Sequence, residues 1–117
     1  RGCQSLADRP MYRRFNKGLL QTVSQEMIRA TTADLVVESI YIVNTDTSNR
    51  TYSIFHIAAD ESEDDSFALF HEVILRPDTT HVLCENAPIY LRPGERLTAK
   101  ASVADKLALT MYGGQAY

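Results

Sequence analysis

The sequence of 117 residues predicts an all-β fold, an antiparallel β-sandwich of jelly-roll-like type with an extended N-terminal arm. Short segments rich in β-branched and aromatic residues recur along the chain, and such residues suit the pleated surface of a sheet. Turn-forming residues separate these segments about every ten positions, which is typical of sandwiches and barrels. No segment sustains the period of an amphipathic helix.

Length and composition favour a single globular domain. The hydrophobic fraction of 44% and the charged fraction of 23% are ordinary for a soluble protein. No apolar run approaches the roughly 20 residues that a membrane span needs, so no membrane partner is expected.

Eight or nine short strands are expected, within residues 18–23, 27–32, 35–45, 51–59, 67–76, 80–85, 89–92, 97–103 and 107–112. The strongest is 35–45, and the polar residues 46–49 after it predict a hairpin with 51–59. The first residues of 67–76 alternatively suit a short helical turn. Pro93-Gly94 predicts a type II turn, and Gly113-Gly114 is expected to loosen a C-terminal tail.

We expect residues 1–16 to form an arm and residues 17–117 to form the sandwich. The chain up to Lys17 carries five basic residues against Asp8 alone, a net charge of +4, whereas the remainder carries 7 basic and 14 acidic residues, or −7. A basic arm on an acidic body suits an acidic partner such as a sister subunit or a capsid surface. Nucleic acid is the less favoured partner, because the body would repel it. The residues expected to bind a partner are Arg9, Met11, Tyr12, Arg13, Arg14 and Phe15.

Alternation within the strands predicts an oligomer interface. Residues 97–103 have one apolar and one polar face, but in 35–45 Ile40 and Ile42 share one face while Tyr41 and Val43 occupy the other. A strand that is apolar on both faces must be covered on both. We therefore expect Tyr41 and Val43 to contact another copy of the chain, in a trimer or other cyclic homo-oligomer. The alternative is cover by the loops and arm of the same domain.

Enzyme chemistry is not expected, and neither is any cofactor. The sequence has no nucleophile elbow, and His56 and His71 fall within predicted strands, as interface or rim residues would. His81 and Cys84 are two candidate zinc ligands, but their spacing would turn them to opposite faces of a strand.

Residues 60–65 and the two cysteines are the remaining candidates, for a cation site and for a disulfide. Residues 60–65 resemble the first residues of a calcium-binding loop, but the glycine and the bidentate glutamate of such a loop are missing. A solvated acidic loop is expected there, with a weak surface cation site as the alternative. Cys3 and Cys84 are too few for a disulfide scaffold, so Cys84 is expected to be a buried free thiol, with a Cys3–Cys84 bridge as the alternative.

A resemblance covers roughly two-thirds of the chain, between Ile40 and Tyr112. A strand ending in asparagine (IYIVN) is followed by a polar turn and a second strand (TYSIFHIA), then by VILRPDTT, by HVLCENAPIYLRPGERLTAKAS and by LALTMYG. This pattern resembles the small β-sandwich structural proteins of tailed bacteriophages, which serve as head decoration, neck or tail accessory proteins. The resemblance transfers no site residues.

What the resemblance implies is a virion structural protein, made in the host cytoplasm and assembled into the particle. Its expected partners are further copies of itself and other virion proteins of the capsid, neck or tail. The alternative function is a tail-fibre or host-surface adhesion module that binds a glycan.

Overall fold

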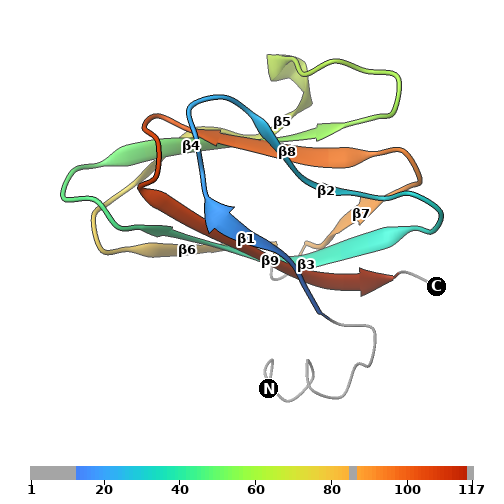
Figure 1. The fold of residues 1–117 in the computed structure, drawn as a ribbon, viewed down its shortest axis with the longest axis horizontal. Helices are drawn as coiled ribbons and strands as arrows, with labels where there is room; N and C mark the ends of the chain where they lie inside the picture. Colours follow the sequence, from blue (N-terminus) through green and yellow to red (C-terminus); the bar gives the residue numbers. More distant parts are fainter. Residues whose placement is uncertain (1–12, 85–86, 116–117) are drawn as a thin grey trace.

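The computed structural model describes residues 13–84 and 87–115, and within them nine strands form two antiparallel sheets packed together (Figure 1). Sheet A contains, in spatial order, β1 (Arg13–Leu19), β9 (Leu107–Gln115), β3 (Leu35–Asn44) and β6 (Thr80–Leu83), and β7 (Ile89–Leu91) pairs with the first residues of β3. Sheet B contains β2 (Gln25–Arg29), β8 (Arg96–Ala101), β4 (Arg50–Ile57) and β5 (Ala68–Leu75). The predicted all-β antiparallel sandwich is confirmed.

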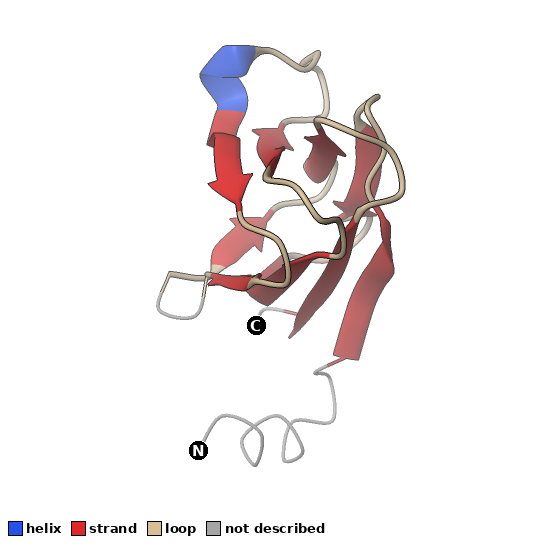
Figure 2. Ribbon diagram, turned by 90° about the vertical axis from the view of Figure 1, so that its left-hand side faces the viewer, coloured by secondary structure: helices blue, strands red, loops and turns tan. Residues whose placement is uncertain are grey.

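One short helix accompanies the strands in the described part of the chain. It is the 3₁₀ turn η1 (Asp65–Phe67), which shares only Phe67 with the 67–76 segment, where a helical turn was the alternative (Figure 2). No helix among residues 13–84 and 87–115 is long and apolar enough to cross a membrane.

The hydrophobic core lies between the two sheets. Along each strand, alternate side chains enter the core, as the two-residue period of a strand requires. The buried members of the core are Leu20, Ala30, Leu35, Val37, Ile40, Ile42, Tyr52, Ile54, Leu75, Leu91, Leu97, Ala99, Ala101, Leu107, Leu109 and Met111.

The expected hairpin between residues 35–45 and 51–59 is wrong, because β3 lies in sheet A and β4 in sheet B. The cause is a corner built around Asn44, whose side chain is buried at the end of β3. Its amide nitrogen donates to the carbonyl oxygens of Ser48, at 2.9 Å, and Leu75, at 2.8 Å. The Leu75 bond reaches the end of β5 in sheet B, so the asparagine ties the turn across the two sheets.

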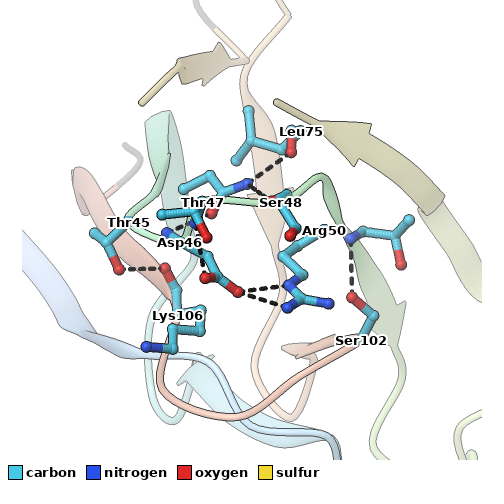
Figure 3. Close-up of polar contacts among 10 residues, drawn as sticks. Thr45, Asp46, Thr47, Ser48, Arg50, Leu75, Ser102 and Lys106 are labelled. Atoms are coloured by element: carbon cyan, nitrogen blue, oxygen red, sulfur yellow. Dashed lines mark hydrogen bonds and ion pairs between the residues drawn. The ribbon is translucent and has the colours of Figure 1, made fainter. Parts of the chain in front are cut away.

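The turn after Asn44 is closed by local polar contacts (Figure 3). The Asn44 side-chain oxygen accepts a hydrogen bond from the N–H of Asp46 at 2.8 Å, and the Asp46 carboxylate accepts from the Thr47 N–H and from Arg50 Nε, both at 2.7 Å. These donors lower the pKa of Asp46, the Thr47 N–H most. Residues 46–49 therefore fold as a sheet-to-sheet corner.

Two ends of the sandwich extend further than predicted. β1 spans Arg13–Leu19 and pairs with β9, so residues 13–16, assigned above to the arm, belong to sheet A, and the strand expected at 18–23 is wrong beyond Leu19. At the other terminus, Gly113 and Gly114 continue β9 and pair with Val37 and Val36, so the expected loosening at these glycines is wrong. Both glycines are held by their pairing with β3, and Gly113 also pairs with Arg13 of β1.

The tight turn predicted at Pro93-Gly94 is confirmed. The N–H of Glu95 donates to the carbonyl of Arg92 at 2.9 Å, and Gly94 has φ +94°. A Cβ at this glycine would stand 2.7 Å from the Cβ of Ala59, so both the backbone conformation and the close approach of the 58–67 loop require glycine here.

The outer side of sheet B is covered by residues 58–67, drawn in light green on the side away from sheet A (Figure 1). Phe55 and Ile57 of β4 stand outside the core cluster, yet they are 1% and 0% exposed. Arg96 of β8 donates to the carbonyl oxygens of Ala58, at 3.1 Å, and Glu61, at 3.0 Å, which holds this loop against the sheet. β4 is thus apolar on both faces and is covered by the domain itself.

Candidate interaction surface

The outer side of sheet A carries the largest group of exposed apolar side chains that share one sheet surface in the described structure. We call this surface the sheet A face and define it by ten uncharged outward side chains of its five strands. On β3, β6, β7 and β9 they alternate with residues that pack in the core. The ten side chains are those of Leu19, Val36, Tyr41, Val43, Thr80, Val82, Tyr90, Ala108, Thr110 and Tyr112.

Strand register arranges these side chains in rows across the sheet. One row runs from Lys17 on β1 through Thr110 on β9 and Tyr41 on β3 to Val82 on β6. Tyr41 and Val82 are 37% and 39% exposed, and the ring of Tyr41 meets that of Tyr112 edge-on with centroids 5.8 Å apart. The middle of the face is therefore aromatic and only partly covered.

Charge lies at two places around the face. Exposed Arg14 and Lys17 line the β1 edge, and Glu38 stands at the bulge of β3 opposite Tyr112. The ten uncharged side chains include three tyrosines, and aromatic side chains are enriched in protein–protein contacts.

The described residues among the predicted site residues all belong to sheet A. Tyr41 and Val43 both lie on the sheet A face, with Tyr41 exposed and Val43 half-buried. Arg13, Arg14 and Phe15 belong to β1 at the edge of the same sheet. Arg9, Met11 and Tyr12 lie outside the described residues.

Several members of the face were missed by the sequence reasoning. Tyr90, which is 60% exposed, reaches the face because β7 pairs with β3, and Val82 reaches it through β6. Tyr112 follows Met111 in the predicted strand 107–112 and so takes the opposite face, but only the pairing of β9 with β3 places it beside Tyr41.

The histidines take part in structural contacts. His81 faces the core from β6, and its Nδ1 stands 2.9 Å from the hydroxyl of Tyr52 on β4, which joins the two sheets. Burial raises the pKa of Tyr52. His56 Nε2 stands 3.1 Å from Glu95 and is half-buried, in line with the expected rim position.

Among the residues that the structure describes, neither the histidines nor Cys84 form a metal centre. Within the described ranges, no three His, Cys, Asp or Glu side chains gather as metal ligands would. Cys84 is a half-buried free thiol packed against the core, and burial raises its pKa. Cys3 lies outside the described residues.

Two carboxylates of the acidic loop, those of Glu63 and Asp64, accept hydrogen bonds from other residues of the protein. Glu63 accepts hydrogen bonds from the hydroxyls of Thr98 and Ser24, each at 2.7 Å. Asp64 caps η1 by accepting from the N–H of Ser66 at 3.0 Å, and the hydroxyl and N–H of Ser66 lower its pKa. These oxygens serve the folding of the loop over sheet B and do not converge on a common point.

A shallow polar depression of about 240 Å³ lies on the outer side of sheet B, beside that loop. Its lining includes the hydroxyl side chains of Thr22, Thr51 and Ser102, together with Glu72 and Lys100. Glu72 has φ +48°, and its N–H donates to the Ser53 hydroxyl at 2.9 Å. A non-glycine residue with a positive φ is strained. Such residues often occur at β-bulges, where the change in the backbone redirects the side chain.

No family model, curated protein or solved structure matches this chain.

Proposed function

We propose that this chain is a structural protein of a bacteriophage virion, a decoration (cement) subunit or a head–tail (neck) accessory subunit that binds the particle and associates with itself. The observation that carries the proposal is the sheet A face, a broad, largely apolar, tyrosine-rich surface on a small domain. Monomeric proteins rarely leave large continuous apolar patches in water, and such patches mark sites of protein contact.

The strand order supports the architectural part of this proposal. Jelly rolls are built from eight antiparallel strands in two sheets. Here the orders β1-β9-β3-β6 and β2-β8-β4-β5 give two four-stranded sheets with β7 as an addition, and the chain passes repeatedly from one sheet to the other. We therefore describe the sandwich as jelly-roll-like, an architecture that recurs in capsid domains.

This proposal assigns the function to contact surfaces. Three of the polar side chains that the sequence offered as chemical groups make contacts within the fold: His81 with Tyr52, His56 with Glu95, and Glu63 with Thr98. Many identical subunits on a particle can hold firmly through modest contacts, because each further contact forms at high effective concentration.

The N-terminal arm is the second element of the proposal, as a latch on a neighbouring virion protein. Because β1 begins at Arg13, the informative deletion is residues 1–12, which removes Arg9, Met11 and Tyr12 and keeps the strand. We expect the shortened chain to fold and to be lost from purified particles, measured as copies per particle by quantitative mass spectrometry. Normal occupancy of the shortened chain would refute the latch.

A matched control separates the loss of the arm from the loss of charge. Replacing Arg9 and Arg1 with Gln lowers the charge of the arm but keeps its length and its apolar side chains. We expect an intermediate occupancy for this variant, since charge and apolar contact both contribute to docking. Absence of the full-length protein from purified particles would refute the virion role.

The polar depression on sheet B supports a second candidate function, binding of a host-surface glycan. Its lining includes Glu72, Lys100, Thr51 and Ser102, whose carboxylate, ammonium and hydroxyl groups suit the hydroxyls of a sugar. A glycan array probed with the native protein tests this candidate, with Glu72→Gln as the comparison. Binding that is lost in the variant supports adhesion, and an array without signal rejects it.

A further inference from the structure

We infer that two copies of this chain pack through their sheet A faces, related by a two-fold axis that runs along the strands between Thr110 and Tyr41. The inference rests on the proposed function, because it names the partner of the same surface. Under this symmetry each copy contributes the same residues, as an isologous contact requires.

The size of the face agrees with a stable pair. Four strands spaced about 4.8 Å apart span roughly 19 Å, and the nine residues of β9 span roughly 30 Å. The flat projection is therefore about 600 Å², and the accessible surface of projecting side chains is larger than its projection. A standard protein contact buries about 800 Å² per partner, so the face is of the right order.

The position of Tyr41 agrees with a centre of contact. It stands in an inner strand of the sheet, in the row from Lys17 to Val82, and is in ring contact with Tyr112. Tyrosines near the middle of a contact are the side chains that most often carry its affinity.

The charge distribution selects the direction of the axis. Facing sheets pack with their strands nearly aligned, so a two-fold axis in the contact plane runs either along the strands or across them. An axis across the strands would lay the β1 edge of one copy over the β1 edge of the other and bring Arg14 and Lys17 against their own copies. An axis along the strands lays β1 over β6, so that Lys17 of one copy stands over the uncharged Val82 of the other.

The other outer surface is less suited to this contact. Phe55 and Ile57, the apolar outward side chains of β4, are already covered by residues 58–67. The exposed apolar side chains of sheet B, Leu69 and Ile74, lie on its edge strand β5, away from its middle.

Sedimentation equilibrium on the full chain tests the inference. We expect a mass of twice the 13.1 kDa of the chain, and a dissociation constant raised roughly thirtyfold by Tyr41→Lys, as for a central contact residue. Ile74→Lys, at a 61% exposed position on β5, is the matched control and should leave the mass unchanged. A monomeric or trimeric wild type, or a Tyr41→Lys dimer of unchanged affinity, would overturn the inference.

A charge comparison at Val82 tests the axis itself and does not depend on the folding of the Tyr41 variant. Because Val82 faces Lys17 of the other copy, Val82→Glu should dimerise more tightly than Val82→Lys, by tenfold or more at low salt. Equal affinities for the two variants would refute the axis along the strands.

The virion role and the dimer can be refuted separately. A protein that forms these dimers but is absent from particles contradicts the virion role and leaves the pair intact. A protein that is incorporated into particles but is monomeric in solution and insensitive to Tyr41→Lys contradicts the pair and leaves the virion role.

Discussion

Replacing Asn44 with Ala tests the corner that joins the two sheets. The Asn44 side chain is 1% exposed and makes three hydrogen bonds, to the Ser48 carbonyl at 2.9 Å, to the Leu75 carbonyl at 2.8 Å and from the Asp46 N–H at 2.8 Å. A buried hydrogen bond contributes about 1 kcal/mol net, so the loss of three predicts a decrease of about 3 kcal/mol in the free energy of unfolding. Domains of this size are stable by about 5–15 kcal/mol, so the effect is large.

Urea denaturation followed by circular dichroism measures this difference, provided that the slope of the transition is unchanged. Asn49→Ala is the matched control, since Asn49 is exposed in the same turn and should cost less than about 0.5 kcal/mol. Asn44→Asp keeps an acceptor for the Asp46 N–H and loses both donors, and it should be at least as damaging as Ala because it also buries a charge. Coincident transitions for Asn44→Ala and Asn49→Ala would refute the role assigned to the corner.

Two further predictions concern single polar contacts. Tyr52→Phe removes the hydroxyl that stands 2.9 Å from His81 Nδ1 and should lower the free energy of unfolding by about 1 kcal/mol in the same assay; a change no larger than that of Tyr90→Phe, at an exposed position, would contradict it. The pKa of Asp46 is lowered in the folded state by the Thr47 N–H and by Arg50, so its contribution to stability is present above the ordinary carboxyl pKa of about 4 and is lost as the pH falls through the lower folded value. Asp46→Asn should therefore be less stable than the wild type at neutral pH, and the difference should shrink on acidification; a difference that stays constant down to about pH 2 would count against this account.

Local pattern predicted most of the strands but not β1, which spans residues 13–19 where 18–23 was expected, and it did not predict which strands are neighbours. The period-2 alternation around Ile40 and Tyr41 assigned the inner and outer faces of β3 correctly. The polar residues 46–49 suit a hairpin and a corner equally well, because both need only a few turn-forming residues. What decides between them is the hydrogen bond from Asn44 to Leu75, a residue 31 positions away.

The same limit applies to the candidate surface. Tyr41 and Val43 were predicted from one strand, whereas Tyr90 and Val82 join them only through strand pairing. From the sequence, a strand with two apolar faces can be covered either by another copy of the chain or by loops of the same domain. In the structure, β4 is covered in the second way, because a loop of the domain buries Phe55. For β3, Tyr41 stays partly exposed to water.

The loop over sheet B also sets how many neighbours such a subunit could hold in the same way. If both outer surfaces were open and apolar, copies could add on either side and stack into columns of indefinite length. Because Phe55 and Ile57 are already buried, the outer side of sheet B is covered, whereas the sheet A face is open. A pair formed through the sheet A faces leaves no equivalent surface for a third copy, so assembly by this contact would end at a dimer. Any larger assembly would depend on contacts of another kind.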